Sequence, residues 1–158
     1  MRAAGLALVL LSLALSAFAV DLGKAEGSLT VNSTRIDLAY AYAVGHQKDD
    51  ITKRSDEVKV VLTDKALPDS VKINDLDFNF PEGVLGLIVS ITADDKVSHV
   101  IVQHPTGMYD SGYTEEGREY RFKPKNTEGT ITGNVSSRRV QTNTMTFSFD
   151  VEFAATVK

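Results

Sequence analysis

The C-terminal stretch of the chain alternates hydrophobic and polar positions with a period of two. Between Met145 and Val157 the odd-numbered positions are all apolar, among them Phe147, Phe149 and Phe153, whereas most even-numbered positions are polar. A strand with one buried and one wet face gives this pattern, whereas a helix repeats every 3.6 residues. The sequence therefore predicts a half-buried strand, in which burial of each phenylalanine contributes about 1.5 to 3 kcal/mol.

The same alternation recurs in the segment 35–45. One predicted face carries Ile36, Leu38, Tyr40, Tyr42 and Val44. The opposite face carries Arg35, Asp37, Ala39, Ala41 and Ala43. Its three alanines make a flat, apolar strip, which another element or a second subunit could cover. We therefore expect a strand here, and a possible homo-oligomer through Ala39, Ala41 and Ala43.

Shorter segments with strand character fill most of the remaining chain. They are residues 28–31, 58–63, 76–80, 84–92, 97–103, 119–123 and 129–135. Turn-forming residues separate them, and a hairpin is expected around residues 93–96. Only the segment 64–76 has helical character, enough for one short turn. Eight or nine strands without long helices predict an antiparallel β-sandwich of immunoglobulin-like type, with a barrel as the second choice.

The N-terminus has the features of a secretory signal peptide. Arg2 precedes an apolar run, which ends in the small-x-small sequence Ala17-Phe18-Ala19. We expect cleavage near Ala19, which leaves residues 20–158 as a single domain without a further apolar segment long enough to span a bilayer. The expected location is secreted or periplasmic, in a bacterium.

Composition excludes several classes of function. The formal net charge is −4 and there is no cysteine. An acidic chain is a poor partner for nucleic acids, which bind clustered positive charge. The lack of cysteine excludes thiol nucleophiles, disulfide exchange and Cys-ligated zinc. Stability must therefore come from packing, and we expect no cofactor.

Three histidines are the first candidates for catalytic or metal chemistry. His46 follows a strand-like segment, and His99 and His104 are five residues apart. Positions i and i+5 of a regular strand point to opposite faces, so His99 and His104 would not bind one ion unless a bulge lay between them. A hydrolase or metal-dependent enzyme that uses His46, His99 or His104 is therefore kept as an alternative function.

Two further patterns resemble known sites in part. Asp75, Asp77 and Asn79 have the i, i+2, i+4 spacing that begins a calcium loop, but the glycine and the final acid of that loop are missing. A solvated strand face explains them better. Ser111 lies close in sequence to His104 and Asp110, yet no nucleophile-elbow motif surrounds it, so a serine triad is a weak hypothesis.

The stretch 104–117 is predicted to be a long loop between two strands. Its glycines permit tight reversals, and its exposed aromatic side chains favour either a lid on the fold or a contact surface. The candidate contact residues are His104, Met108, Tyr109, Asp110 and Tyr113. After it, Arg121 and Lys123 alternate with Tyr120 and Phe122, which predicts a charged outer face and a buried aromatic face.

Three stretches carry a resemblance to a group of proteins. With GSLTVNSTRIDLAYAYA, VVLTDKALP and FSFDVEFAATV, the chain resembles small exported all-β proteins of bacteria. The likeness concerns residues that form the fold, so it implies an architecture and no functional residues. We expect an exported, non-catalytic binding or interaction module for an unknown protein or small ligand. A third hypothesis is an assembly subunit that pairs through sheet edges.

Overall fold

The computed structural model describes residues 20–46, 57–76, 80–112, 120–125 and 129–158. The predicted signal peptide, residues 1–19, lies outside this part, so its cleavage stays a prediction. The described elements are β1 (Lys24–Val31), β2 (Thr34–His46), β3 (Glu57–Thr63), the 3-10 turn η1 (Ile73–Asp75), β4 (Gly86–Thr92), β5 (Val97–His104), β6 (Gly107–Asp110), β7 (Tyr120–Pro124), β8 (Thr130–Ser137), β9 (Val140–Gln141) and β10 (Thr146–Thr156).

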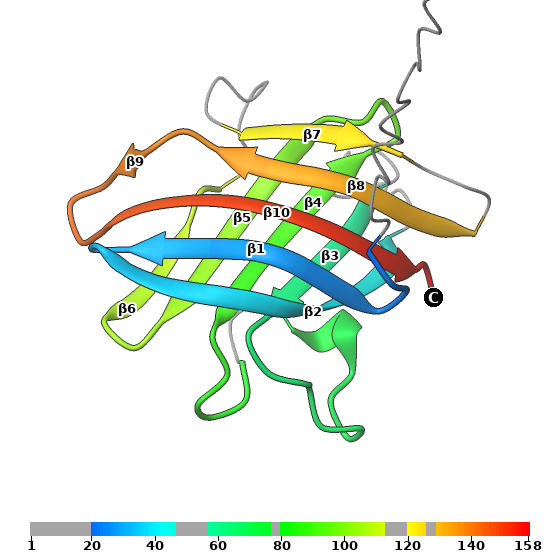
Figure 1. Ribbon diagram of the computed structural model, residues 1–158, viewed down its shortest axis with the longest axis horizontal. Coiled ribbons are helices and arrows are strands. Elements are labelled where there is room, and N and C mark those ends of the chain that lie inside the picture. Colours follow the sequence, from blue (N-terminus) through cyan, green and yellow to red (C-terminus); the bar gives the residue numbers. More distant parts are fainter. Residues whose placement is uncertain (1–19, 47–56, 77–79, 113–119, 126–128) are drawn as a thin grey trace, which may run out of the picture.

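These strands form one antiparallel sheet that curls into a half-barrel. The order is β6-β5-β4-β3-β2-β1-β10-β8-β7, and β9 pairs with β10 beside this path. Figure 1 shows β1, β10 and β8 crossing in front of β3, β4 and β5, with the core between the two layers. The predicted all-β class is confirmed. The immunoglobulin-like sandwich is not, because one path of paired strands joins both layers instead of two separate sheets.

The C-terminal strand β10 has the predicted phase. Phe147, Phe149 and Phe153 are at most 3% exposed and belong to the main core. On the neighbouring strand, Leu29 lies opposite Phe149 and Val31 opposite Phe147. Because β10 lies between β1 and β8, its apolar face packs at the middle of the front layer.

The long strand β2 does not keep one phase. Ile36 and Leu38 face the main core as predicted, but Ala41 and Ala43 face it as well, at 2% exposure each. The positions that face the main core change from even-numbered to odd-numbered residues near the place where the β1–β2 register shifts. Beyond it Tyr42 packs on the opposite side of the sheet.

The predicted alanine strip is therefore not a surface. Ala39 is half-buried, and Ala41 and Ala43 pack inside the half-barrel. The slip occurs where β2 leaves the front layer and begins to pair with β3. The core already uses Ala41 and Ala43, which argues against a homo-oligomer through Ala39, Ala41 and Ala43. Self-association itself stays a prediction.

A second apolar cluster covers the outer side of β3, β4 and β5. Val61, Ile88 and Ile101 point away from the main core and pack against Leu67 and Leu76 of the β3–β4 connection. The Tyr42 hydroxyl accepts a 2.9 Å hydrogen bond from the Leu67 N–H. Both faces of these strands are thus buried in their central parts, which explains the consecutive apolar residues at 60–62, 87–89 and 100–102.

The ammonium of Lys59 holds this connection to the sheet. Lys59 is 4% exposed, and its Nζ donates to the carbonyl oxygens of Asn74 at 3.0 Å and Leu76 at 3.4 Å. The connection contains the one short helical turn that the sequence predicts, η1. The strand predicted at residues 76–80 is not confirmed, because Leu76 caps η1 and residues 77–79 lie outside the described part.

Candidate binding site

The stretch after His104 is a hairpin and not a long loop in its described part. Gly107–Asp110 pairs with the end of β5, with residues 105–106 as a tight turn. The prediction of a loop was wrong here, because a strand of 4 residues is too short to show a clear alternation of apolar and polar positions. Residues 113–119, and with them Tyr113, lie outside the described part.

The predicted contact residues divide between the two faces of this hairpin. His104 is 7% exposed, and Tyr109 packs its ring 4.9 Å from the ring of Phe147 in the core. Met108, at 41% exposure, and Asp110 lie on the other face. The hairpin therefore brings together only pairs of these residues, and their role in contact stays a prediction.

Among the described residues, the fold brings together the side chains of His99 and Asp110, an imidazole and a carboxylate. Nε2 of His99 lies 2.5 Å from Oδ1 of Asp110, across β5 and β6. Burial alone would raise the pKa of Asp110, but the hydrogen bonds from His99 and the Gly112 N–H, with electrostatic attraction to His99, outweigh burial. The pKa of Asp110 consequently lies below its ordinary value, and the pair ties β6 to β5.

No serine triad forms around Ser111. Its Oγ accepts a hydrogen bond from the Val100 N–H at 2.9 Å and donates to the Gly112 carbonyl at 2.7 Å. His104 instead bonds with Thr106, whose N–H donates to Nδ1 at 3.2 Å. Burial lowers the pKa of His104, which favours a neutral imidazole. The three residues of the hypothesis thus have separate partners.

The alternative of a metal-dependent enzyme finds no ligand cluster in the described part of the chain. Three or more His, Asp or Glu side chains do not converge anywhere in these residues. His99 and His104 lie on opposite faces of β5 as predicted, since the β5 bulge occurs before His99 and not between them. The structure describes His46 only as the end of β2, and Asp77 and Asn79 are outside the described residues.

The half-barrel is open between β7 and the β4–β5 hairpin, and a hollow of about 370 Å³ lies there. We call this place the seam hollow. It is lined by Asp95, Lys96, Val97, Tyr120, Arg121, Phe122 and Lys123. The hairpin that carries the first three forms as predicted, because Thr92 Oγ1 donates to Asp94 at 2.6 Å and Asp95 takes a left-handed φ of 61°.

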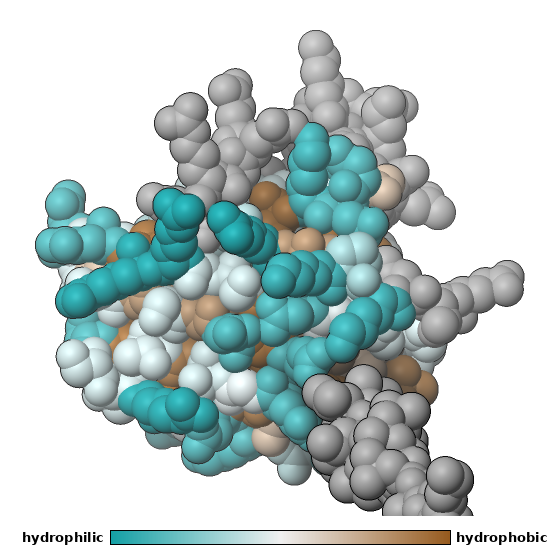
Figure 2. Space-filling model, turned by 45° about the horizontal axis from the view of Figure 1, so that its top comes forward, coloured by the Kyte–Doolittle hydropathy of each residue, from teal (hydrophilic) through white to brown (hydrophobic). Residues whose placement is uncertain are grey.

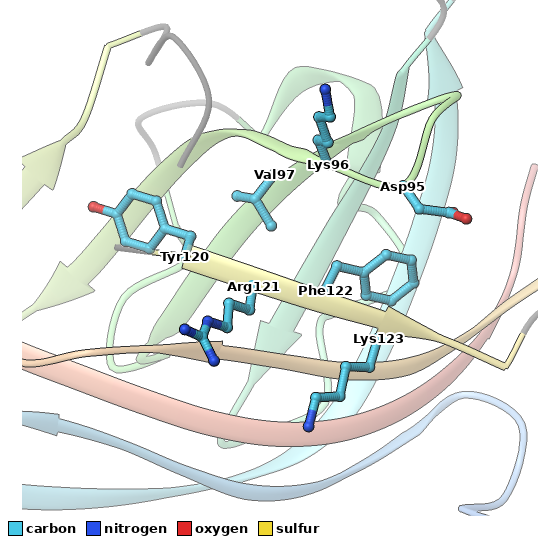
Figure 3. A pocket seen from close by; sticks show the side chains of 7 residues that line it. All are labelled: Asp95, Lys96, Val97, Tyr120, Arg121, Phe122 and Lys123. Carbon is cyan, nitrogen blue, oxygen red and sulfur yellow. The ribbon is translucent and has the colours of Figure 1, made fainter. Parts of the chain in front are cut away.

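The floor of the seam hollow is apolar. Figure 3 shows Tyr120 and Phe122 on the side of β7 that faces Val97. The Tyr120 and Phe122 rings stack on Phe149 and Phe153, each at 6.0 Å between centroids. β10 therefore fixes the position of the floor, in which Val97 and Tyr120 are buried and Phe122 is half-buried.

The other side of β7 is positively charged. Arg121 and Lys123 are exposed and point away from the floor (Figure 3). Their neighbours on β8, Ser136 and Asn134, carry no charge. Figure 2 turns this side of the molecule forward and shows apolar surface between long hydrophilic side chains. The seam hollow thus combines an apolar floor with a cationic strand edge.

Alternation in the sequence identified the two faces of β7 but not the seam hollow. The alternation in residues 120–124 does not show that this strand ends the sheet, and residues 95–97 are far away in sequence. The short Tyr120–Pro124 strand with its terminal proline is the one local signal, because proline is confined to edges and ends of strands.

No helix in the described residues is long and apolar enough to cross a membrane. No family model matches the chain, and neither a curated protein nor a solved structure matches it.

Proposed function

We propose that this chain is an exported, non-catalytic binding module that takes its ligand at the seam hollow. The observation that carries the proposal is the incomplete closure of the sheet beside a preformed apolar floor of Val97, Tyr120 and Phe122. The seam hollow has a volume of about 370 Å³, which falls in the range of small-ligand sites. Export is supported by the signal-like residues 1–19.

The catalytic alternative has less support. A general base must reach the proton that it removes, and a nucleophile must be free to attack. His99 is held against Asp110, the Ser111 hydroxyl donates to a carbonyl, and His104 lies on the opposite face of β5 from His99. The polar groups at the hairpin therefore act as links between strands.

Binding of 1-anilinonaphthalene-8-sulfonate tests the proposal, because this probe has an apolar ring system and a fluorescence that rises when it leaves water. In amide NMR spectra the probe should shift residues 95–97 and 120–123 and leave β3 unchanged. Phe122→Ser should weaken binding about tenfold, since the ring forms part of the floor. Phe80→Ser is the matched control, because Phe80 is also half-buried but packs on the outer cluster.

Circular dichroism and amide dispersion must show that both variants remain folded, since loosely packed proteins also bind this probe. Shifts spread over other surfaces, or equal weakening in both variants, would refute a site at the seam hollow.

A further inference from the structure

We infer that the ligand of the seam hollow is an amphiphilic anion, a small molecule that carries one apolar group and one carboxylate, sulfonate or phosphate. The inference rests on the proposed site and names the chemistry of its ligand. The apolar group lies on the floor of the hollow, and the anionic group lies at its mouth beside the cations of β7. The size, polarity and charge of the site each restrict the ligand in this direction.

The size of the seam hollow limits the apolar group. Its volume of about 370 Å³ is at the low end of the range of small-ligand sites. β7 bounds it on one side and the β4–β5 hairpin on the other (Figure 3). A single ring system or a short acyl chain suits this volume.

The floor selects an apolar group. The side chains of Val97 and Phe122 carry no group that forms hydrogen bonds, and the half-buried ring of Phe122 offers accessible apolar surface. This ring stacks on Phe153 with 6.0 Å between the centroids, which fixes its position before a ligand arrives. Contact with the ring removes apolar surface from water, whereas a sugar or another hydroxyl-rich ligand would lose hydrogen bonds to water there.

The mouth of the hollow supplies positive charge. Arg121 and Lys123 line it from β7, and both side chains are exposed. Within the described part of the chain, neither of them forms an ion pair. Their charged groups point away from the floor and stay in water (Figure 3), where these long, flexible side chains can reach an anion that projects from the hollow.

The surrounding carboxylates do not cancel this charge. Glu152, on the outer face of β10, forms an ion pair of 2.5 Å with Lys125. On the opposite rim, Lys96 pairs with Asp94 at 3.1 Å, so the charge that remains comes from β7. Among the described residues that line the hollow, Asp95 alone is acidic, against three cations. The lining is therefore positive, which favours an anion over a neutral or cationic ligand.

The test compares two probes that share one ring system. 1-Anilinonaphthalene-8-sulfonate carries a sulfonate, and N-phenyl-1-naphthylamine is the same molecule without the sulfonate and is uncharged at neutral pH. In fluorescence titrations of the purified protein, the sulfonate should bind about tenfold more tightly at low ionic strength, a factor within reach of two exposed charge pairs. The difference should shrink as salt is added, because salt screens exposed charges.

Arg121→Gln/Lys123→Gln removes both charges and keeps long polar side chains. It should lower the affinity for the sulfonate about tenfold and leave the affinity for the amine unchanged within about twofold. Arg138→Gln/Arg139→Gln is the matched control, since both arginines are exposed but lie outside β7 and the lining of the hollow, and it should change neither affinity. Phe122→Ser should weaken both probes alike, because both use the floor.

Equal affinity of the two probes for the parent protein would overturn the inference, and so would a sulfonate affinity that the glutamine variant leaves unchanged. If both probes bind equally and shift the amide signals of residues 95–97 and 120–123, the seam hollow binds apolar ligands regardless of charge. The proposed function then stands and the inference fails. If neither probe shifts these signals, both fail.

Discussion

Gly27 shows how one position of β1 can depend on a missing side chain. Its φ is 146°, and a Cβ placed there would lie 2.7 Å from Val151 Cα and still closer to the Asp150 carbonyl oxygen. Gly23 also has a positive φ, 81°, but has open space around it. The two positions therefore separate the steric cost of a side chain from the cost of the backbone conformation.

Gly27→Ala should lower the free energy of unfolding by about 3 kcal/mol or more, because β1 and β10 must move apart in addition to the backbone strain. Gly23→Ala should cost only about 1 kcal/mol, from the strain alone. Urea denaturation of both variants measures the difference. Similar losses would mean that β10 yields easily at Val151.

His104 makes stability depend on pH. Burial lowers its pKa from the ordinary 6.5, so the unfolded chain takes up a proton before the folded chain does. Stability should therefore fall as pH decreases through 6.5 toward the lowered value, whereas the contribution of Asp110 is lost only below 3.8. His104→Gln should reduce the change of the urea midpoint between pH 7 and 5. If the midpoint of this variant changes with pH as much as in the parent protein, His104 is not the group responsible.

The strands differ in how far the sequence predicts them. β10 lies in one layer, between β1 on one side and β8 and β9 on the other, so its alternation is regular from Phe147 to Phe153. β2 runs from the front layer to the rear one, and its two halves bury opposite sets of positions. Such a change of phase depends on which strands pair with β2, and the periodicity within a segment does not predict that pairing.

Replacement of the alanines of β2 tests the slip. Ala43→Leu should destabilise the protein by about 1 to 3 kcal/mol, because the larger side chain must enter a packed core. Ala39→Leu should change stability by about 0.5 kcal/mol or less, since Ala39 is only half-buried. Chemical denaturation of both variants gives the comparison. Equal losses would support the unbroken alternation that the sequence suggests.

The candidate site was less accessible to prediction than the fold. The faces of β7 follow from the alternation of Tyr120 and Phe122 with Arg121 and Lys123, and the hairpin at 93–96 follows from its turn residues. That β7 and this hairpin lie side by side does not follow from the sequence of either segment. It is set by the curl of the whole sheet, which brings β7 near β5 without closing the barrel.

A half-barrel that stays open must limit pairing at its two edges, β6 and β7. Charged residues and proline at an edge are a known protection against unwanted strand pairing. β7 carries Arg121, Lys123 and Pro124 within five residues. These three residues therefore oppose self-association through β7, which bears on the hypothesis of an assembly subunit.

The variant Arg121→Val/Lys123→Val/Pro124→Val removes this protection and restores a backbone N–H. We expect its average mass in multi-angle light scattering to rise with concentration, because the edge becomes apolar and complete. Arg138→Val/Arg139→Val makes the same change of charge away from the edge and should leave the mass as in the parent protein. If the edge variant also keeps the parent mass at its highest soluble concentration, the charges of β7 do not protect the seam, and the opening is closed to a strand by some other means.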